Sequence, residues 1–122
     1  MPRTVSRKPA PLKIVNLEEG LPTVAAARLR LEHELHQARR SGCVALKLIH
    51  GYGSSGAGGA LRQELQKDLR HAAELGGIRA FIAGEDWRVS NETAWTWLQR
   101  FPEWKQDSDL GRGNRGISIV VL

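Results

Sequence analysis

The stretch LKLIHGYGSSGAGGALRQEL, residues 46–65, decides the fold class. An apolar run ends at His50, residues 51–60 are glycine, serine or alanine apart from Tyr52, and a helical pattern begins at Leu61. This order predicts a strand, a glycine-rich loop and a helix. Consecutive glycines and serines let backbone N–H groups converge on an anion, and the start of the helix adds a partial positive charge. We therefore expect the loop to hold a phosphate group.

Strands and helices alternate along the rest of the chain. Apolar runs predict four strands, at residues 12–17, 43–49, 78–84 and 117–122. Apolar residues spaced by three and four predict helices from Pro22 or Thr23 to about residue 40, at about 59–75, and at 91–101. Ser90 is expected to cap the third helix and Pro102 to end it. The order β-α-β-α-β-(α)-β predicts an α/β fold with a sheet of about four strands.

The composition is typical of a single globular domain. The chain has 122 residues, of which 41% are hydrophobic and 25% are charged. No segment approaches the roughly 20 apolar residues that cross a bilayer, and no apolar run typical of a secretory signal follows the N-terminus. The one cysteine, Cys43, excludes an intramolecular disulfide. We expect a cytoplasmic protein without a membrane partner.

The positive charge is concentrated at the N-terminus. The net charge is +5, and residues 1–13 supply +4 of it without an acidic residue, through Arg3, Arg7, Lys8 and Lys13. The remaining 109 residues therefore carry only +1. Residues 1–11 are predicted to form a disordered basic tail, which either keeps the protein soluble or helps to bind phosphates. A single folded domain is expected at residues 12–122.

Two nucleotide-binding motifs resemble the loop, and both are incomplete. Residues 51–56 match the G-x-G-x-x-G pattern of dinucleotide-binding folds, in which an acidic residue follows about 20 residues later. Here Glu85 lies 29 residues beyond Gly56, and the chain has too few strands for two mononucleotide-binding halves. A P-loop requires a lysine directly after its second glycine, whereas Ala57 follows Gly56. A nucleotide cofactor is therefore the least favoured ligand.

The residues around the loop resemble the Smr (small MutS-related) domain family. The signature of that family is an apolar strand ending in I-H-G-x-G, followed by a helix that begins with a leucine and a basic residue. His50, Gly51 and Gly53 fall on the strand and loop part of the signature. Leu61 and Arg62 fall on the start of the helix. The match of both parts, in this order, makes the resemblance more specific than the I-H-G-x-G motif alone.

The resemblance extends over residues 12–122, with an additional Trp-rich helical insertion at about 87–110. The C-terminal GNRGISIVVL, residues 113–122, is similar to the closing turn and hydrophobic strand of the family. The resemblance implies a two-layer α/β sandwich with a mixed sheet of about four strands. It also implies binding of DNA or RNA at the loop and, in some members, endonuclease cleavage.

A second family motif is altered in this chain. In active members L-D-x-H ends the first strand and takes part in cleavage, whereas this chain has Val15-Asn16-Leu17-Glu18. Asn16 is neither a base nor a strong metal ligand. Two functions therefore remain open. The domain binds the nucleic-acid backbone, or it is a metal-dependent endonuclease that uses His50 together with Glu18 or Glu19, where the acid holds Mg²⁺ or Mn²⁺ and activates water. Otherwise Glu18 is a solvated acid near a helix N-terminus, and no other cofactor is expected.

Nucleic-acid contacts are expected from the loop and from two neighbouring segments. For His50 two roles stay open: it bonds to phosphate or transfers a proton, or it is a structural residue whose ring bonds to the backbone in a tight turn. Tyr52 either stacks on a base or packs under its own loop. Arg112 and Arg115 either reach phosphates or remain solvated. The predicted binding residues are His50, Gly51, Tyr52, Gly53, Ser54, Ser55, Gly56, Arg62, Arg112 and Arg115.

The insertion suggests a third class of function, that of a protein-interaction module. Trp97 and Phe101 are four residues apart, and we expect them to cover the core beside Leu98. Trp87 and Trp104 are expected to form a surface for a protein partner.

Overall fold

The computed structural model describes residues 9–20, 23–52 and 57–122. Most of the predicted basic tail lies outside the described residues, as do Gly53, Ser54, Ser55 and Gly56 of the loop. The elements are β1 (Leu12–Asn16), α1 (Val24–Arg40), β2 (Ala45–Ile49), α2 (Ala57–Glu74), β3 (Ala80–Ala83), the 3-10 helix η1 (Gly84–Asp86), α3 (Glu92–Arg100), the 3-10 helix η2 (Pro102–Gln106) and β4 (Ile117–Val121). The predicted order of strands and helices is confirmed.

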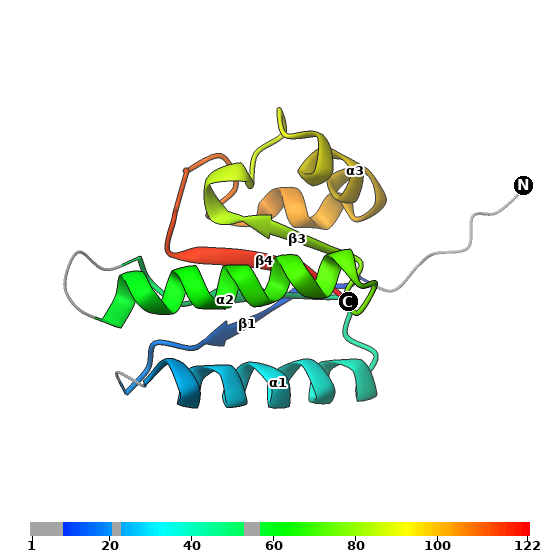
Figure 1. Ribbon diagram of the computed structural model, residues 1–122. Coiled ribbons are helices and arrows are strands. Elements are labelled where there is room, and N and C mark those ends of the chain that lie inside the picture. Colours follow the sequence, from blue (N-terminus) through cyan, green and yellow to red (C-terminus); the bar gives the residue numbers. More distant parts are fainter. Residues whose placement is uncertain (1–8, 21–22, 53–56) are drawn as a thin grey trace, which may run out of the picture.

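The four strands form one mixed sheet in the order β1-β2-β4-β3. β1 and β2 are parallel, with Asn16 opposite Ile49, and helix α1 is the crossover between them. β4 is antiparallel to both β2 and β3, and its first residue, Ile117, lies opposite Ile49. The ends of β1, β2 and β3 therefore meet the start of β4 at one edge of the sheet (Figure 1). This edge carries the glycine-rich loop.

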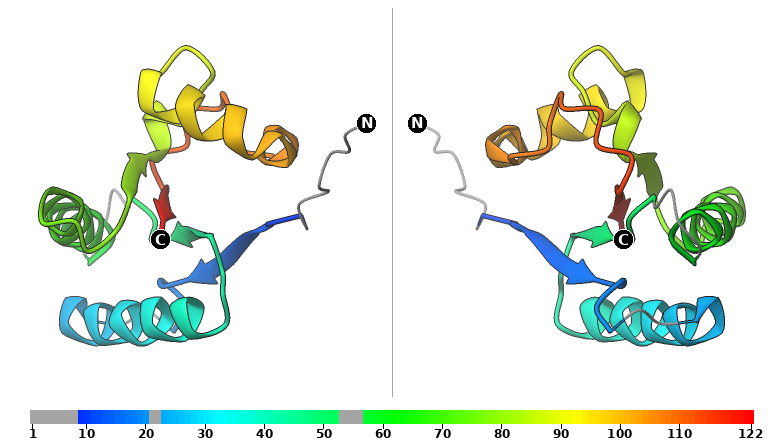
Figure 2. Two further views of the ribbon diagram at one scale, coloured as in Figure 1. Left: turned by 90° about the vertical axis from the view of Figure 1, so that its right-hand side faces the viewer. Right: turned by 90° about the vertical axis from the view of Figure 1, so that its left-hand side faces the viewer.

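Helices α1 and α2 cover one face of the sheet (Figure 2). Thr23 caps α1, because its Oγ1 accepts a hydrogen bond from the Ala26 N–H at 3.1 Å. Arg28 of α1 pairs with Asp68 of α2 at 2.6 Å and ties the two helices together. The core of this face is formed by buried side chains of the two helices and the strands beneath them, among them Val15, Leu31, Leu46, Leu48, Leu65, Leu69 and Val120. These helices and the sheet make up the two layers that the family resemblance implies.

The Trp-rich insertion covers the opposite face and adds a layer there (Figure 2). Trp87 and Trp104 are buried in this second core, at 0% and 2% exposure, so the expectation that they form a partner surface is wrong. Their indole rings cover the apolar face of the sheet, and each indole N–H finds an acceptor inside the fold. Trp87 donates to Asp107 at 3.0 Å, and Trp104 donates to the carbonyl of Ala10 at 2.5 Å.

Helix α3 packs into the second core through its apolar side. Leu98 and Phe101 are buried and Trp97 packs against them, as expected. The cap of α3 differs from the expectation: Asn91 Oδ1, rather than Ser90, accepts from the backbone N–H three residues on, at 3.0 Å. The Ser90 hydroxyl instead accepts a hydrogen bond from a neighbouring arginine.

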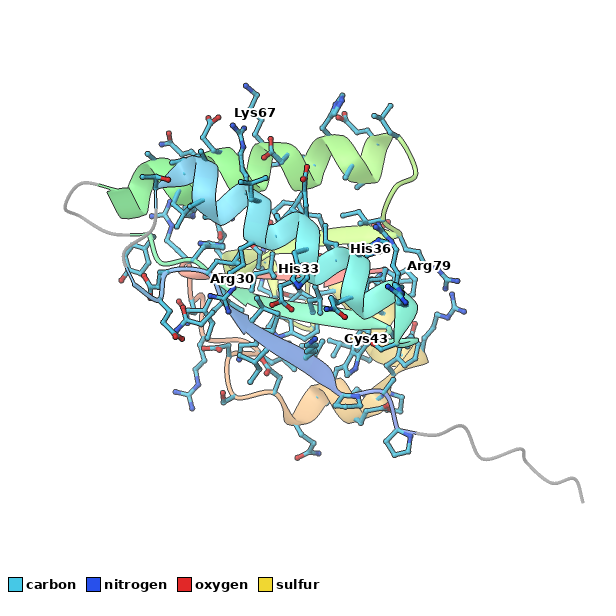
Figure 3. All side chains as sticks on the ribbon, turned by 90° about the horizontal axis from the view of Figure 1, so that it is seen from below. Arg30, His33, His36, Cys43, Lys67 and Arg79 are labelled. Atoms are coloured by element: carbon cyan, nitrogen blue, oxygen red, sulfur yellow. The ribbon has the colours of Figure 1, made fainter. Side chains whose placement is uncertain are left out.

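The outer side of α1 carries exposed polar side chains, among them Arg30, His33 and His36 (Figure 3). Arg79 is also exposed, and it directly precedes β3, at the end of the sheet opposite to the loop. Within the described ranges, no helix combines the length and the apolar character needed to span a membrane.

Candidate functional site

The turn that follows β2 is hydrogen-bonded to the segment that precedes β4. The backbone N–H groups of His50 and Gly51 both donate to the carbonyl of Gly116, each at 3.0 Å. Gly51 has a φ of +72°, a left-handed conformation that glycine adopts without steric cost. The two segments therefore form one unit at the edge of the sheet, although they are more than sixty residues apart in sequence.

The His50 ring is fully buried beneath this turn. Its Nδ1 lies 2.7 Å from the carbonyl oxygen of Gly51, so this nitrogen is the donor, and Nε2 then accepts from the Ser118 hydroxyl at 2.8 Å. Burial lowers the pKa of His50 below its usual value, which favours the neutral ring. Of the two roles left open by the sequence, this geometry matches the structural one. A role in phosphate binding or proton transfer stays a prediction.

Glu18 lies beside the turn because β1 and β2 are parallel and in register. The Leu17 N–H donates to the carbonyl of Ile49 at 2.7 Å, which continues the pairing one residue beyond β1. Asn16 Oδ1 accepts from the Glu18 N–H at 3.0 Å and so closes a local turn. The Glu18 carboxylate is then so close to Gly51 that a Cβ atom at that position would collide with it. Glu18 is thus a neighbour of the His50–Gly51 turn, as the sequence predicts.

Arg62 projects from the first half of α2 toward the segment before β4. Its Nε donates to the carbonyl of Arg115 at 3.2 Å, and its Nη2 forms an ion pair with Glu85 Oε2 at 2.6 Å. The second carboxylate oxygen of Glu85 is buried without a hydrogen-bond partner among the described residues. The side chains of Arg112 and Arg115 are exposed. Of the three predicted arginines, Arg62 is therefore already paired within the fold.

A buried charge network supports the same segment, and sequence reasoning missed it. Lys47 in the middle of β2 is only 4% exposed and pairs with Asp107 at 3.0 Å and with Asp109. Asp109 also accepts from the Asn114 amide at 2.9 Å, and Asn114 Oδ1 accepts from the Gly116 N–H at 2.9 Å. The only signal in the sequence was a lysine within the apolar strand ALKLI, together with acids in a distant polar loop.

The pKa shifts of Lys47 and Asp109 both favour their charged forms. Burial alone would lower the pKa of Lys47, but its hydrogen bonds to Asp109 and Asp107 outweigh burial and raise it above the usual value. The hydrogen bond from Asn114 and the nearby Lys47 hold the pKa of Asp109 below its usual range. Ion pairs of Lys47 with Asp107 and Asp109 therefore join the sheet to the insertion.

An open pocket of about 460 Å³ lies between these segments. Its wall includes the carboxylate-bearing Glu18, two apolar isoleucines, and Tyr52, which has 59% of its surface exposed. The lining residues are Glu18, Ile49, Gly51, Tyr52, Asp109, Asn114, Gly116 and Ile117.

The predicted Mg²⁺ or Mn²⁺ site has no matching ligand set in the part of the chain that the structure describes. No three His, Cys, Asp or Glu side chains there lie close enough to hold one ion together. Glu18 offers one carboxylate, and both ring nitrogens of His50 bond within the chain. These residues do not fit a metal, and we derive no catalytic step from one.

Comparison with known proteins identifies the family. The family model of the Smr domain matches residues 19–86, more than half of the chain. The chain belongs to the Smr domain family. This Smr domain is also similar to the Smr domain of Thermus thermophilus MutS2, at 28% sequence identity and a TM-score of 0.56, over 91% of this chain and 98% of that chain. No curated protein matches the sequence. The predicted family and its mixed α/β fold are confirmed, and proteins with an Smr domain are generally associated with nucleic acids.

The range of the family match covers part of the site. The matched range contains the His50–Gly51 turn, Arg62 and Glu85. Glu18 and the insertion after Asp86 lie outside it.

Proposed function

We propose that this Smr domain binds the phosphate backbone of DNA or RNA at the edge of the sheet that carries the His50–Gly51 turn. The observation that carries the proposal is the convergence of arginines on one segment. Arg112 and Arg115 are exposed on the segment that receives the hydrogen bonds of the turn, and Arg62 reaches the same segment from α2. Guanidinium groups bind phosphates through paired N–H donors, so these side chains suit a polyanionic ligand.

In this proposal His50 positions the binding surface. Its buried ring joins the turn to Ser118 of β4, while its backbone N–H is bound to Gly116. These bonds hold the turn and the arginine-bearing segment together, so that they present one rigid surface to the ligand. Gly53, Ser54, Ser55 and Gly56 complete the predicted loop and remain expected contacts, outside the described residues.

The proposal is tested by binding of labelled single-stranded, duplex and branched DNA and RNA, measured by fluorescence anisotropy over a range of salt concentrations. Binding is expected to weaken steeply with salt, because backbone contacts release counterions. The Arg112→Ala/Arg115→Ala double variant is expected to bind more weakly and to lower the slope of log K against log salt by about one per lost phosphate contact.

The matched control is the Arg30→Ala/Arg79→Ala double variant, which removes the same charge from α1 and from the residue directly before β3 (Figure 3). It should retain nearly all of the affinity. Salt-insensitive binding, or equal losses in both double variants, would contradict the proposal. The same samples, incubated with Mg²⁺ or Mn²⁺ and run on denaturing gels, report on the alternative of endonuclease cleavage.

A further inference from the structure

The pocket beside Gly51 contains a carboxylate, that of Glu18, which has no partner among the described residues. Asp109 and Asn114 are engaged, because Asp109 binds Lys47 and Asn114, and Asn114 also holds the Gly116 N–H. The Glu18 carboxylate, by contrast, forms no hydrogen bond or ion pair with any other described residue. It occupies the space that the missing side chain of Gly51 leaves open. As far as the structure describes the chain, the pocket thus presents a carboxylate without a partner.

The rest of the pocket suits a flat ring. Ile49 and Ile117 contribute apolar wall, and the Tyr52 ring stands exposed at the rim. Aromatic side chains at such positions stack on bases, and stacking tolerates every base. The volume of about 460 Å³ lies within the range of small-molecule pockets. The exposed Arg112 and Arg115 belong to the segment that also supplies Asn114 and Gly116 to the wall, so the backbone next to a bound base would run past them.

We propose that this pocket receives an unpaired nucleobase and that Glu18 selects guanine. The inference rests on the proposed function and names the ligand of the same surface. A carboxylate only accepts hydrogen bonds. Guanine offers two adjacent donors on its Watson–Crick edge, N1–H and the N2 amino group, which match the two carboxylate oxygens. In adenine, cytosine and uracil each donor on that edge stands beside an acceptor, which the carboxylate repels.

The charge of Glu18 makes it a determinant of specificity. Next to the phosphates of the ligand, a negatively charged carboxylate weakens the binding of any base that does not donate hydrogen bonds to it. Glu18 therefore disfavours the other bases in addition to favouring guanine. In a duplex the Watson–Crick edge of guanine is occupied, so the pocket accepts guanine only from single strands, loops or bulges.

The test compares oligonucleotides of one length and sequence that differ at a single central base within a uridine run. Wild-type protein should bind the guanine oligonucleotide about 5- to 100-fold more tightly than those with adenine, cytosine or uracil, the range of one good bidentate base contact. Inosine, which lacks the N2 amino group, should lose part of that preference. Glu18→Gln should abolish the preference, because its amide replaces one acceptor by a donor.

The matched control is Glu19→Gln, which makes the same charge change at an exposed neighbour that does not line the pocket. It should keep the preference for guanine. Equal affinity of wild-type protein for all bases, or a preference that survives in Glu18→Gln, would overturn this inference while leaving backbone binding intact. Absence of binding to every oligonucleotide would overturn the proposed function and this inference with it.

Discussion

Replacing Lys47 by methionine should destabilise the domain severely. The ammonium group of Lys47 is shared between Asp107 and Asp109, and the side chains of the three residues are only 5%, 11% and 22% exposed. Lys47→Met keeps most of the side-chain volume but leaves two carboxylates facing each other in a poorly solvated space. Removing one partner of a buried ion pair costs about 3–5 kcal/mol. That is a large part of the total stability of a typical domain, which is about 5–15 kcal/mol.

Urea and thermal unfolding followed by circular dichroism measure this loss. We expect the free energy of unfolding to fall by about 3–5 kcal/mol and the melting temperature by on the order of 10 °C or more. Lys67→Met, at an exposed site on α2, should change stability by no more than about 0.5 kcal/mol. Adding Asp107→Asn and Asp109→Asn to Lys47→Met should recover part of the loss, because neutral amides cost less to bury than charges. A loss below about 1 kcal/mol, or no recovery, would refute the reasoning.

Three further predictions concern the edge of the sheet around the turn. Glu85→Gln removes the ion-pair partner of Arg62. Fluorescence anisotropy should then show nucleic-acid binding that is about 3- to 10-fold tighter and depends more steeply on salt. Weaker binding would mean that Glu85 positions Arg62 for its ligand. Burial lowers the pKa of His50, so the unfolded chain takes up a proton at this residue at higher pH than the folded domain does. Urea unfolding should therefore show that the free energy of unfolding falls as the pH drops below about 6.5. His50→Gln should flatten that dependence, and an unchanged pH slope would contradict this. Gly51→Ala places a side chain at a φ of +72° and against Glu18, so thermal unfolding should show a loss of about 1–2 kcal/mol, whereas wild-type stability would argue against this turn geometry.

The fold was predictable because local patterns and global topology agree. The apolar runs gave every strand to within two residues at each end, and the periodicity of α1 and α2 follows from the single apolar face that each packs on the sheet. The proximity of Glu18 to His50 was predictable as well, since two parallel strands that end together bring the residues after them side by side.

Contacts between distant segments were not predictable. Lys47 and Asp107 are sixty residues apart, and no local pattern shows that a lysine in a strand meets acids in a remote loop. The burial of Trp87 and Trp104 was missed for a related reason: a cluster of aromatic residues indicates a large apolar area, but not whether it faces the sheet or a partner. For His50, only the structure shows that Ser118 supplies the second hydrogen-bond partner of the ring.

The location of the nucleic-acid surface is the central claim, and an NMR titration tests it most directly. In ¹H–¹⁵N spectra of the labelled protein, a short single-stranded RNA or DNA should shift the backbone amides of Tyr52, Arg112 and Arg115 at the edge of the sheet. The amides of Gly42 and Gly76, which lie before β2 and β3 at the opposite end, should stay in place. Shifts centred on that opposite end or on the outer side of α1, with none around Tyr52, would contradict the account.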